Sequence, residues 1–271
     1  MTEPDRIHGF RQPQSGGKRL HSSYGWSARL GLIVPTTNTV NEAEWQLLLA
    51  TCQGISLHVA RMDLHLDHST QPDGQLLHAN LKTALGQLTP ASLDAIAYGC
   101  TAGSMISPLD ALSDAMEGEA GVPCATTAAS LVHAARHLGL QKVAVATPYA
   151  ENLNAHEQTY LHEHGLDVLS IRGLGLGAGG VHELRGIARV PEEEVYAHAL
   201  ASWHPEADGM IISCTDFPTL RVLPALEARL GKPVISSNAA TLWRMLELSG
   251  LTHRFEGYGQ LLQAQSGESG K

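Results

Sequence analysis

An internal repeat constrains the fold of this chain more than any other feature. Three blocks of the first half return in the same order in the second half, at separations of 110 to 114 positions. Blocks that recur in order are not expected by chance, and they indicate a duplicated structural unit. The matched pairs are residues 29–38 with 142–151, 93–101 with 207–215, and 121–128 with 231–238.

The repeated unit alternates short apolar runs with longer segments of helical period. Runs that are apolar throughout are typical of strands covered on both faces of a parallel sheet. We therefore predict an α/β fold with two similar, flavodoxin-like parallel-sheet domains related by a pseudo-two-fold axis, and an active site in the cleft between them. Strands are expected at residues 29–34, 55–60, 95–98, 123–125, 142–146, 167–171, 210–213 and 233–236, and the clearest helices at 42–52, 128–138 and 239–248.

Changes in composition along the chain indicate the domain boundaries. Residues 1–27 carry glycine, proline and polar side chains without a usable period, so we expect a flexible N-terminal arm. The first domain is placed at residues 28–140 and the second at 141–255, followed by a tail at 256–271. We expect the last long helix to pack back on the first domain.

Charge and composition exclude several classes of partner. The net charge of −9 and the aromatic content of 5% are opposite to the basic, aromatic-rich pattern of nucleic-acid binders. No apolar run approaches the roughly 18 residues that a membrane span needs. The first residues lack a secretory apolar region, and four cysteines in 271 residues are too sparse for a disulfide scaffold. We expect a cytoplasmic protein with free thiols, and apolar helix faces in both halves lead us to expect a homodimer.

Two of the four cysteines occupy equivalent places in the repeat. Cys100 and Cys214 each follow a predicted strand, and each is followed by a threonine, Thr101 or Thr215. Ligands of parallel sheets bind at the carboxyl ends of the strands, so both thiols should face one cleft. Each Cys-Thr pair enters a segment that can start a helix, which would lower the pKa of the thiol. Burial as an inert apolar residue is the alternative for each cysteine, and it is the role expected of Cys52 and Cys124.

A loop of small polar residues follows the first predicted strand. Pro35, Thr36, Thr37 and Asn38 precede a helix that begins near residue 41, and backbone N–H groups at a helix start bind anions. The equivalent segment of the second half contains Tyr149. Two such loops on one cleft suit a small carboxylate or amino-acid substrate. Simple N-capping is the alternative role for the threonines and asparagines.

Together these segments resemble the aspartate/glutamate racemase superfamily. The resemblance covers about residues 28–255 and is closest to the maleate cis–trans isomerase and arylmalonate decarboxylase branch, with the ectoine-utilisation racemase-like proteins nearby. It implies that Cys100 and Cys214 are the catalytic thiols and that Asn38 and Tyr149 hold substrate carboxylates. The segments that carry it are 31–39, 98–104, 147–149, 213–215 and 233–243.

The resemblance implies an isomerase that works without a metal or an organic cofactor. In one version a thiolate adds to an alkene carbon, the C2–C3 bond rotates and the trans acid leaves. In the alternative version the two thiols exchange an α-proton as a racemase or epimerase of an amino acid or an ectoine-derived diamino acid. Decarboxylation of an arylmalonate is a third version, although the decarboxylases typically keep one of the two cysteines. A ligand-binding or thiol-sensing protein without turnover remains the non-enzymatic alternative.

Two positions depart from the maleate isomerases. Those enzymes use a further asparagine after the fifth strand, and residues 173–191 contain none. Asp216 adds a negative charge beside the second Cys-Thr pair, which favours a substrate that carries an ammonium group. The glycine-rich segment 173–180 is expected to be a loop over the cleft, and Pro191 is expected to open a helix. The histidine pairs at residues 65 and 68 and at 162 and 164 lack metal-site spacing.

Overall fold

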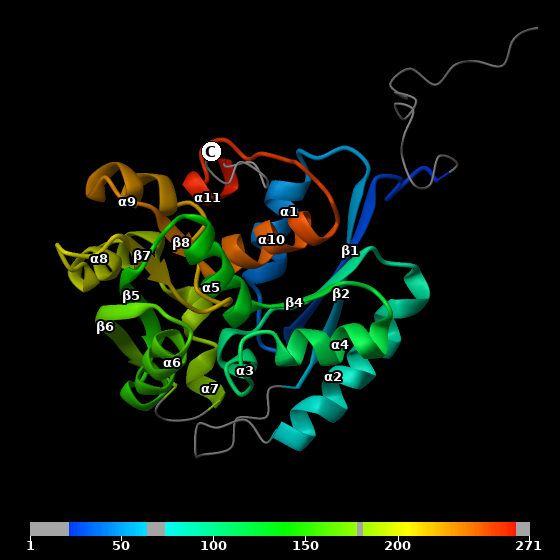
Figure 1. Cartoon of the computed structure of the whole chain (residues 1–271), viewed down its shortest axis with the longest axis horizontal. Helices are drawn as coiled ribbons and strands as arrows, with labels where there is room; N and C mark the ends of the chain where they lie inside the picture. Colours follow the sequence, from blue (N-terminus) through cyan, green and yellow to red (C-terminus); the bar gives the residue numbers. More distant parts are fainter. Residues whose placement is uncertain (1–21, 64–73, 178–180, 264–271) are drawn as a thin grey trace, which may run out of the picture.

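The computed structural model describes residues 22–63, 74–177 and 181–263, which form two halves of like topology (Figure 1). Each half has a four-stranded sheet with all its strands parallel. The elements of the first half are β1 (Ala28–Pro35), α1 (Asn41–Leu49), β2 (Ile55–Met62), α2 (Gly74–Leu88), the 3₁₀ turn η1 (Thr89–Ala91), β3 (Ala95–Tyr98), α3 (Thr101–Ser104), α4 (Ala111–Ala120), β4 (Cys124–Thr126) and α5 (Thr127–His137).

The second half repeats this order with local changes. Its elements are β5 (Lys142–Tyr149), α6 (Glu151–Glu163), β6 (Asp167–Leu176), α7 (Val181–Leu184), η2 (Ile187–Arg189), α8 (Glu192–Ser202), β7 (Gly209–Ile212), α9 (Leu223–Leu230), β8 (Val234–Ser236), α10 (Ser237–Leu248) and α11 (Gln260–Gln263).

Strand order confirms the predicted fold class. The sheets run β2-β1-β3-β4 and β6-β5-β7-β8, so each strand has a counterpart at the same place in the other half. The central strands β1 and β5 are almost wholly buried, whereas the edge strands β2 and β6 are partly exposed. This burial explains the continuous apolar runs of the central strands, because helices cover both of their faces.

Matched glycines end matched helices. Gly121 follows α4 with φ 68°, and Gly231 follows α9 with φ 66°. A left-handed residue at this place lets the chain leave the helix, and glycine adopts it at the least cost. In both halves a proline then leads directly into the next strand. The third block of the sequence repeat is therefore a conserved helix-to-strand turn within the chain.

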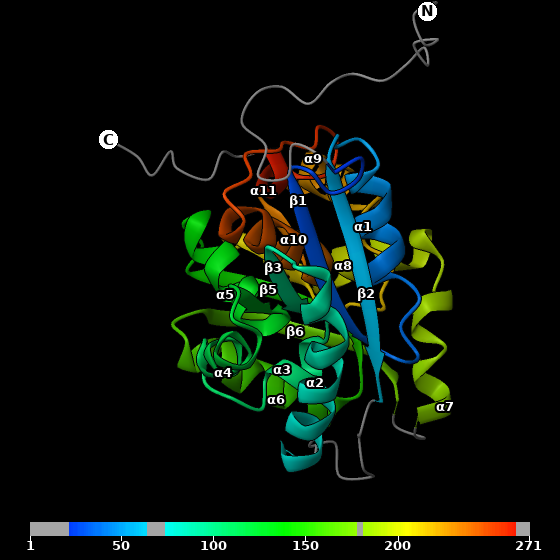
Figure 2. The same cartoon turned by 90° about the vertical axis from the view of Figure 1, so that its right-hand side faces the viewer.

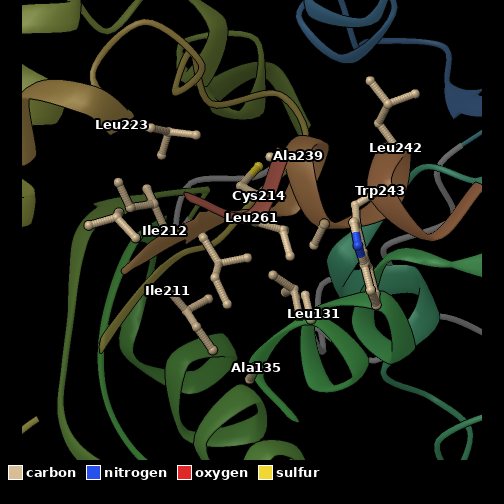
Figure 3. Packing of buried hydrophobic residues seen from close by; sticks show 14 of the residues in the cluster. Leu131, Ala135, Ile211, Ile212, Cys214, Leu223, Ala239, Leu242, Trp243 and Leu261 are labelled. Carbon is tan, nitrogen blue, oxygen red and sulfur yellow. The ribbon is translucent and has the colours of Figure 1, made fainter. Parts of the chain in front are cut away.

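The two halves share one core. Helix α10 packs against α5, its counterpart in the first half, and also against β3, β4 and α1. Figure 3 shows Leu131 of α5 beside Trp243 of α10, and Leu242, Ile211 and Ile212 belong to the same core cluster. Figure 1 shows α5 and α10 between the strands of the two halves, and Figure 2 shows the molecule from the side of β2 and α2. The two halves therefore bury apolar surface against each other, which favours one rigid body around the cleft.

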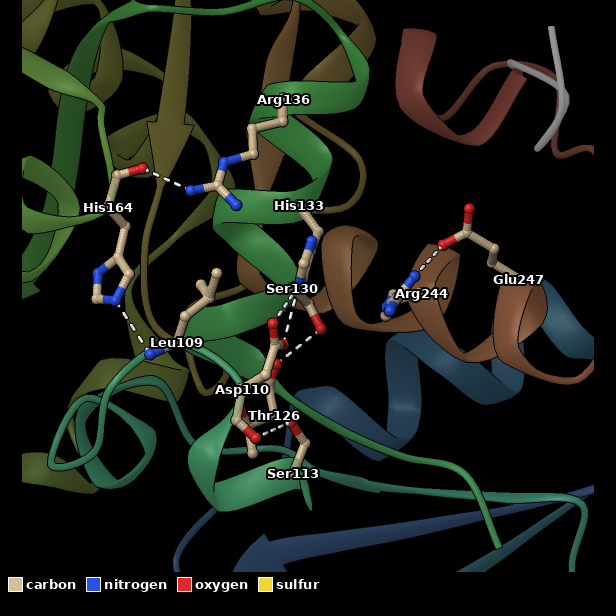
Figure 4. Close-up of polar contacts among 10 residues, drawn as sticks. All are labelled: Leu109, Asp110, Ser113, Thr126, Ser130, His133, Arg136, His164, Arg244 and Glu247. Atoms are coloured by element: carbon tan, nitrogen blue, oxygen red, sulfur yellow. Dashed lines mark hydrogen bonds and ion pairs between the residues drawn. The ribbon is translucent and has the colours of Figure 1, made fainter. Parts of the chain in front are cut away.

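Polar contacts also join the halves (Figure 4). The Leu109 N–H donates to Nε2 of His164 at 3.0 Å, and Arg136 donates to the His164 carbonyl at 2.9 Å. Within the first half, His133 pairs with Asp110 at 2.9 Å. His164 thus links the two halves by hydrogen bonds. This is a structural role for one of the histidines whose spacing did not fit a metal site.

Several local expectations were wrong. β6 extends to Leu176, so residues 173–176 of the glycine-rich segment are strand rather than loop, while residues 178–180 lie outside the described part. No helix starts directly after Cys214, where the chain forms turns until α9. Residues 260–263 of the expected tail form α11, whose Leu261 and Leu262 are buried. The expected N-terminal arm stays a prediction, because its residues 1–21 lie outside the described part; Ser27, near its end, donates its N–H to the Gly54 carbonyl.

The structured helices give no sign of membrane insertion. Among the residues that the structure describes, no helix is both long enough and apolar enough to cross a bilayer.

Candidate active site

A small cavity of about 50 Å³ lies between the two halves, at the carboxyl ends of their central strands. Every residue that the sequence predicted for the site lines it, with the exception of Thr36, whose side chain is exposed. Lining residues from the first half are Pro35, Thr37, Asn38, Cys100, Thr101 and Ala102, and those from the second half are Tyr149, Leu153, Leu184, Ile187, Cys214, Thr215 and Asp216.

Cys100 sits between β3 and the short helix α3. Its φ of −150° is ordinary extended backbone, and its sulfur accepts the Gly103 N–H at 3.3 Å as the N-cap of α3. The Tyr98 hydroxyl also lies against Gly103 and interacts with the Cys100 sulfur. A Cβ at residue 103 would come within 2.2 Å of that hydroxyl and 3.1 Å of the sulfur, so the site requires glycine there.

Cys214 holds a strained backbone. Its φ is 97°, in the region that favours glycine, whereas its counterpart Cys100 is unstrained. Such strain costs about 1–3 kcal/mol and persists only where the surroundings enforce it. The Ser237 hydroxyl accepts the Cys214 N–H at 3.1 Å and bonds Thr101 at 2.9 Å, which ties the strained residue to the other half.

Both thiols are more basic than the sequence predicted. Burial raises the pKa of Cys100, although the Gly103 N–H and the Tyr98 hydroxyl act in the opposite direction. Burial and the Asp216 carboxylate raise the pKa of Cys214 further, and the Tyr149 hydroxyl and the Asp216 N–H only partly offset them. The expected lowering by a helix N-terminus was therefore wrong as a net effect, because desolvation of a thiolate outweighs one or two donors. The surroundings favour a proton on Cys214 more than on Cys100.

Asn38 connects three parts of the site. Its side-chain oxygen accepts the N–H groups of Val40 and Asn41 at 3.1 and 3.0 Å, so it caps α1. Its amide nitrogen donates to the Thr215 hydroxyl of the other half at 3.0 Å. An amide nitrogen carries two protons, and within the described ranges one of them has an acceptor, the Thr215 hydroxyl. The capping and ligand-binding alternatives are thus compatible in this one side chain.

Asp216 faces the cavity from the second half. Its Oδ1 accepts the N–H groups of Thr39 and Val40 at 2.8 and 3.3 Å. Burial nevertheless raises the pKa of Asp216 to about 6, against these two donors and the positive charge of Arg61. At neutral pH its charge acts on both thiols and raises the pKa of each.

An aliphatic wall completes the cavity and was missed by the sequence analysis. Leu153 lies on α6, Leu184 ends α7, and Ile187 opens η2. The last two belong to the segment that lacks the further asparagine of the maleate isomerases. Leu153 is the repeat counterpart of Val40, which is buried but does not line the cavity, so the repeat does not identify it. Within the described ranges, no group of three or more His, Cys, Asp or Glu side chains could hold a metal ion.

The sequence of this chain is similar to those of two kinds of known enzyme. The arylmalonate decarboxylase family profile matches residues 102–262, which include Cys214 and begin just after Cys100. The chain is 33% identical to arylmalonate decarboxylase of Bordetella bronchiseptica over 152 residues, which cover 56% of this chain and 62% of that protein. It is 28% identical to maleate isomerase of Nocardia farcinica over 250 residues, covering 88% of this chain and 96% of that protein.

A solved structure extends the likeness to both halves. The maleate cis–trans isomerase of Nocardia farcinica, as a cysteine-to-serine variant with a covalently bound succinylcysteine intermediate, superposes with a TM-score of 0.78 at 26% identity. The match covers 88% of this chain and 99% of that one. The family profile spans more than half of the chain, and the strand order, the paired thiols and this superposition agree with it. The chain therefore belongs to the arylmalonate decarboxylase family, in the maleate isomerase and arylmalonate decarboxylase branch of the aspartate/glutamate racemase superfamily.

Proposed function

We propose that the protein is a cofactor-independent isomerase that converts a small cis-alkenoic dicarboxylic acid of the maleate type into the trans acid. The observation that carries the proposal is the pair of thiols, Cys100 and Cys214, which line one cavity from equivalent strand ends. The relatives named maleate isomerase, one of which was trapped as a succinylcysteine, support the same chemistry.

Unequal surroundings assign different roles to the thiols. Cys100 is the better nucleophile, because the Asp216 charge is the smallest of the causes that act on its pKa, whereas it is the second largest cause for Cys214, which the Cys100 thiol opposes as well. Cys214 is the proton carrier, because burial and Asp216 hold its proton. Asn38 and the first-turn N–H groups of α3 would hold one carboxylate, and Tyr149 the other.

The reaction follows in four steps. The Cys100 thiolate forms a bond to one alkene carbon, and the π electrons move to the neighbouring carbon. That carbon takes the proton of Cys214, which becomes a thiolate. The C2–C3 bond is now single and rotates. Cys214 then removes a proton, the double bond forms again, and Cys100 leaves as a thiolate with the trans acid released.

Proton NMR tests the proposal with maleate as the probe. We expect the maleate vinyl signal to convert into that of fumarate, and the conversion to fall by at least about 10³-fold in Cys100→Ala and Cys214→Ala. Cys124→Ala is the matched control, because Cys124 is also buried on a strand but lines a different cavity. It should keep the rate of the wild type.

Two results would contradict the isomerase. Unchanged maleate with a wild-type protein that is folded by circular dichroism would remove maleate as a substrate. Exchange of an α-proton of an amino acid in D₂O, with maleate untouched, would replace isomerisation by two-thiol racemisation.

Decarboxylation of a substituted malonate is the second candidate, favoured by the aliphatic wall. Leu153, Leu184 and Ile187 offer no donor to a second carboxylate and would accept an apolar substituent. A disubstituted malonate could leave carbon dioxide and an enediolate, which a thiol then protonates on one face. Incubation with an aryl-methylmalonate should release carbon dioxide if this candidate holds. Leu184→Asn should weaken that reaction, and it should strengthen maleate turnover if the isomerase holds.

A further inference from the structure

Two buried glutamates occupy matched positions of the repeat. Glu44 of α1 and Glu157 of α6 are 113 positions apart, as are the proline residues of the preceding loops. Glu44 has a full set of partners. It accepts the N–H groups of Thr219 and Leu220, each at 2.8 Å, and the Asn238 amide at 2.7 Å. The first glutamate is thus occupied in joining α1 to the other half.

Glu157 has diverged from this role. It is 1% exposed, and neither of its carboxyl oxygens forms a hydrogen bond of normal geometry with any residue that the structure describes. No cationic group among those residues compensates it, and burial raises its pKa to about 7. A buried acid without a partner is costly unless it stays protonated or has a function.

Ser213 diverges at the same place. It immediately precedes Cys214, where the first half has Gly99 before Cys100. Its hydroxyl is fully buried, faces Glu157 and lowers the pKa of that carboxyl, and it too lacks a hydrogen bond of normal geometry within the described part. Two departures from the repeat therefore put an acid and a hydroxyl beside Cys214, whereas at the equivalent place of the first half the neutral, buried Asn41 amide lies against Gly99.

Tyr149 connects this pair to the cavity. Its side chain lines the cavity beside Cys214, interacts with that thiol, and feels the charge of Glu157 as well. Cys100 also acts on this tyrosine. The nearby His198 of α8 contacts the Thr147 carbonyl at 2.9 Å. Glu157 and Cys214 therefore share Tyr149 as a neighbour, and the described residues place no cation among the groups that act on it.

We propose that Glu157, together with Ser213, is a positioning residue that keeps the proton on the Cys214 thiol by acting through Tyr149. The inference rests on the proposed function in that it explains why Cys214, and not Cys100, carries the proton. The glutamate never contacts substrate. When it ionises, its charge holds the proton of the Tyr149 hydroxyl more strongly, so that this hydroxyl is a weaker donor to a Cys214 thiolate.

Thiol alkylation tests this without any substrate. Rates of modification of Cys100 and Cys214 by iodoacetamide are measured on the full chain from pH 6 to 10 by site-resolved mass spectrometry. Glu157→Gln should lower the apparent pKa of Cys214 by at least about half a unit, which is about threefold more thiolate at a given pH. Cys100 in the same sample is the internal reference and should keep its profile. Ser213→Ala should shift Cys214 in the same direction by less.

Glu44→Gln is the matched control, because it makes the same chemical change at the equivalent position of the other half. It should leave the Cys214 profile in place. A Cys214 profile that superposes on that of the wild type in a folded Glu157→Gln protein would overturn the inference. So would equal shifts at both thiols. Failure of maleate turnover, by contrast, would count against the proposed function alone, since alkylation reports the thiol directly.

Discussion

At the scale of a single residue, the left-handed backbone of Cys214 predicts a difference in unfolding free energy between two substitutions at this position. A glycine at this position relieves the strain, whereas an alanine keeps it, so Cys214→Gly should be more stable than Cys214→Ala by about 1 kcal/mol. At Cys100, where the backbone is extended, the order should be reversed. Urea unfolding of the four variants measures both differences, and the same order at both positions would show that Cys214 is not strained.

Asp216 controls the ionisation of both thiols by its charge. With a pKa of about 6 it is ionised at neutral pH, and it raises the pKa of Cys100 and of Cys214. Asp216→Asn should therefore move the alkylation profile of each thiol to lower pH, by about half to one unit. The exposed Asp114 on α4 supplies the control substitution, Asp114→Asn, which should move neither profile. Unmoved profiles in Asp216→Asn would mean that its charge is screened from the cavity.

At the scale of elements, Glu44 holds α1 against the loop after Cys214 and against α10. Glu44→Ala leaves two backbone N–H groups and the Asn238 amide without this acceptor, and should cost about 2–4 kcal/mol of unfolding free energy. Glu44→Gln keeps one acceptor oxygen and should lose much less. Chemical denaturation of the two variants decides the point. Equal losses would show that the charge, rather than the hydrogen bonds, holds the helix.

Helix dipoles contribute little to the pKa values of the two thiols. Only Cys100 caps a helix, and α3 is four residues long. Cys214 leads into turns instead, so the two sites share the Cys-Thr pair but not the backbone structure that follows it. Divergence after the strand, rather than within it, distinguishes the two halves of the site.

For the whole molecule, the two buried glutamates predict how stability depends on pH. Each has a folded pKa of about 7, above the ordinary value of 4.5, so the unfolded chain loses its proton first. The stabilisation that the protonated forms provide is complete below pH 4.5 and is lost as pH rises to about 7, by roughly 2–3 kcal/mol for each group. Unfolding free energies measured between pH 4.5 and 8 should fall accordingly. Glu157→Gln should flatten about half of this slope, and a wild-type curve without the slope would show that neither pKa is raised.

Much of this architecture was predictable, because it depends on local patterns. Continuous apolar runs require strands buried on both faces, and the ordered repeat requires two units of one topology, so the fold class and the pairing of Cys100 with Cys214 followed from spacing. The lining of the cavity by Asn38 and Tyr149 followed from the resemblance. The ends of strands and helices were predicted less accurately. At β6, for example, the glycine-rich end pairs with β5 and does not form a loop.

Tertiary structure alone decided how each matched residue is used. The sequence aligns Glu44 with Glu157 and Cys100 with Cys214, but burial, strain and hydrogen-bond partners depend on segments far away in the chain. Glu44 meets residues 219 and 220, while Glu157 meets Ser213. Desolvation raises the pKa of both thiols by more than backbone donors lower it. Leu184 and Ile187 line the cavity although their segment has no recognisable sequence pattern. Local sequence specifies which elements form, whereas the energy of a buried charge depends on everything packed around it.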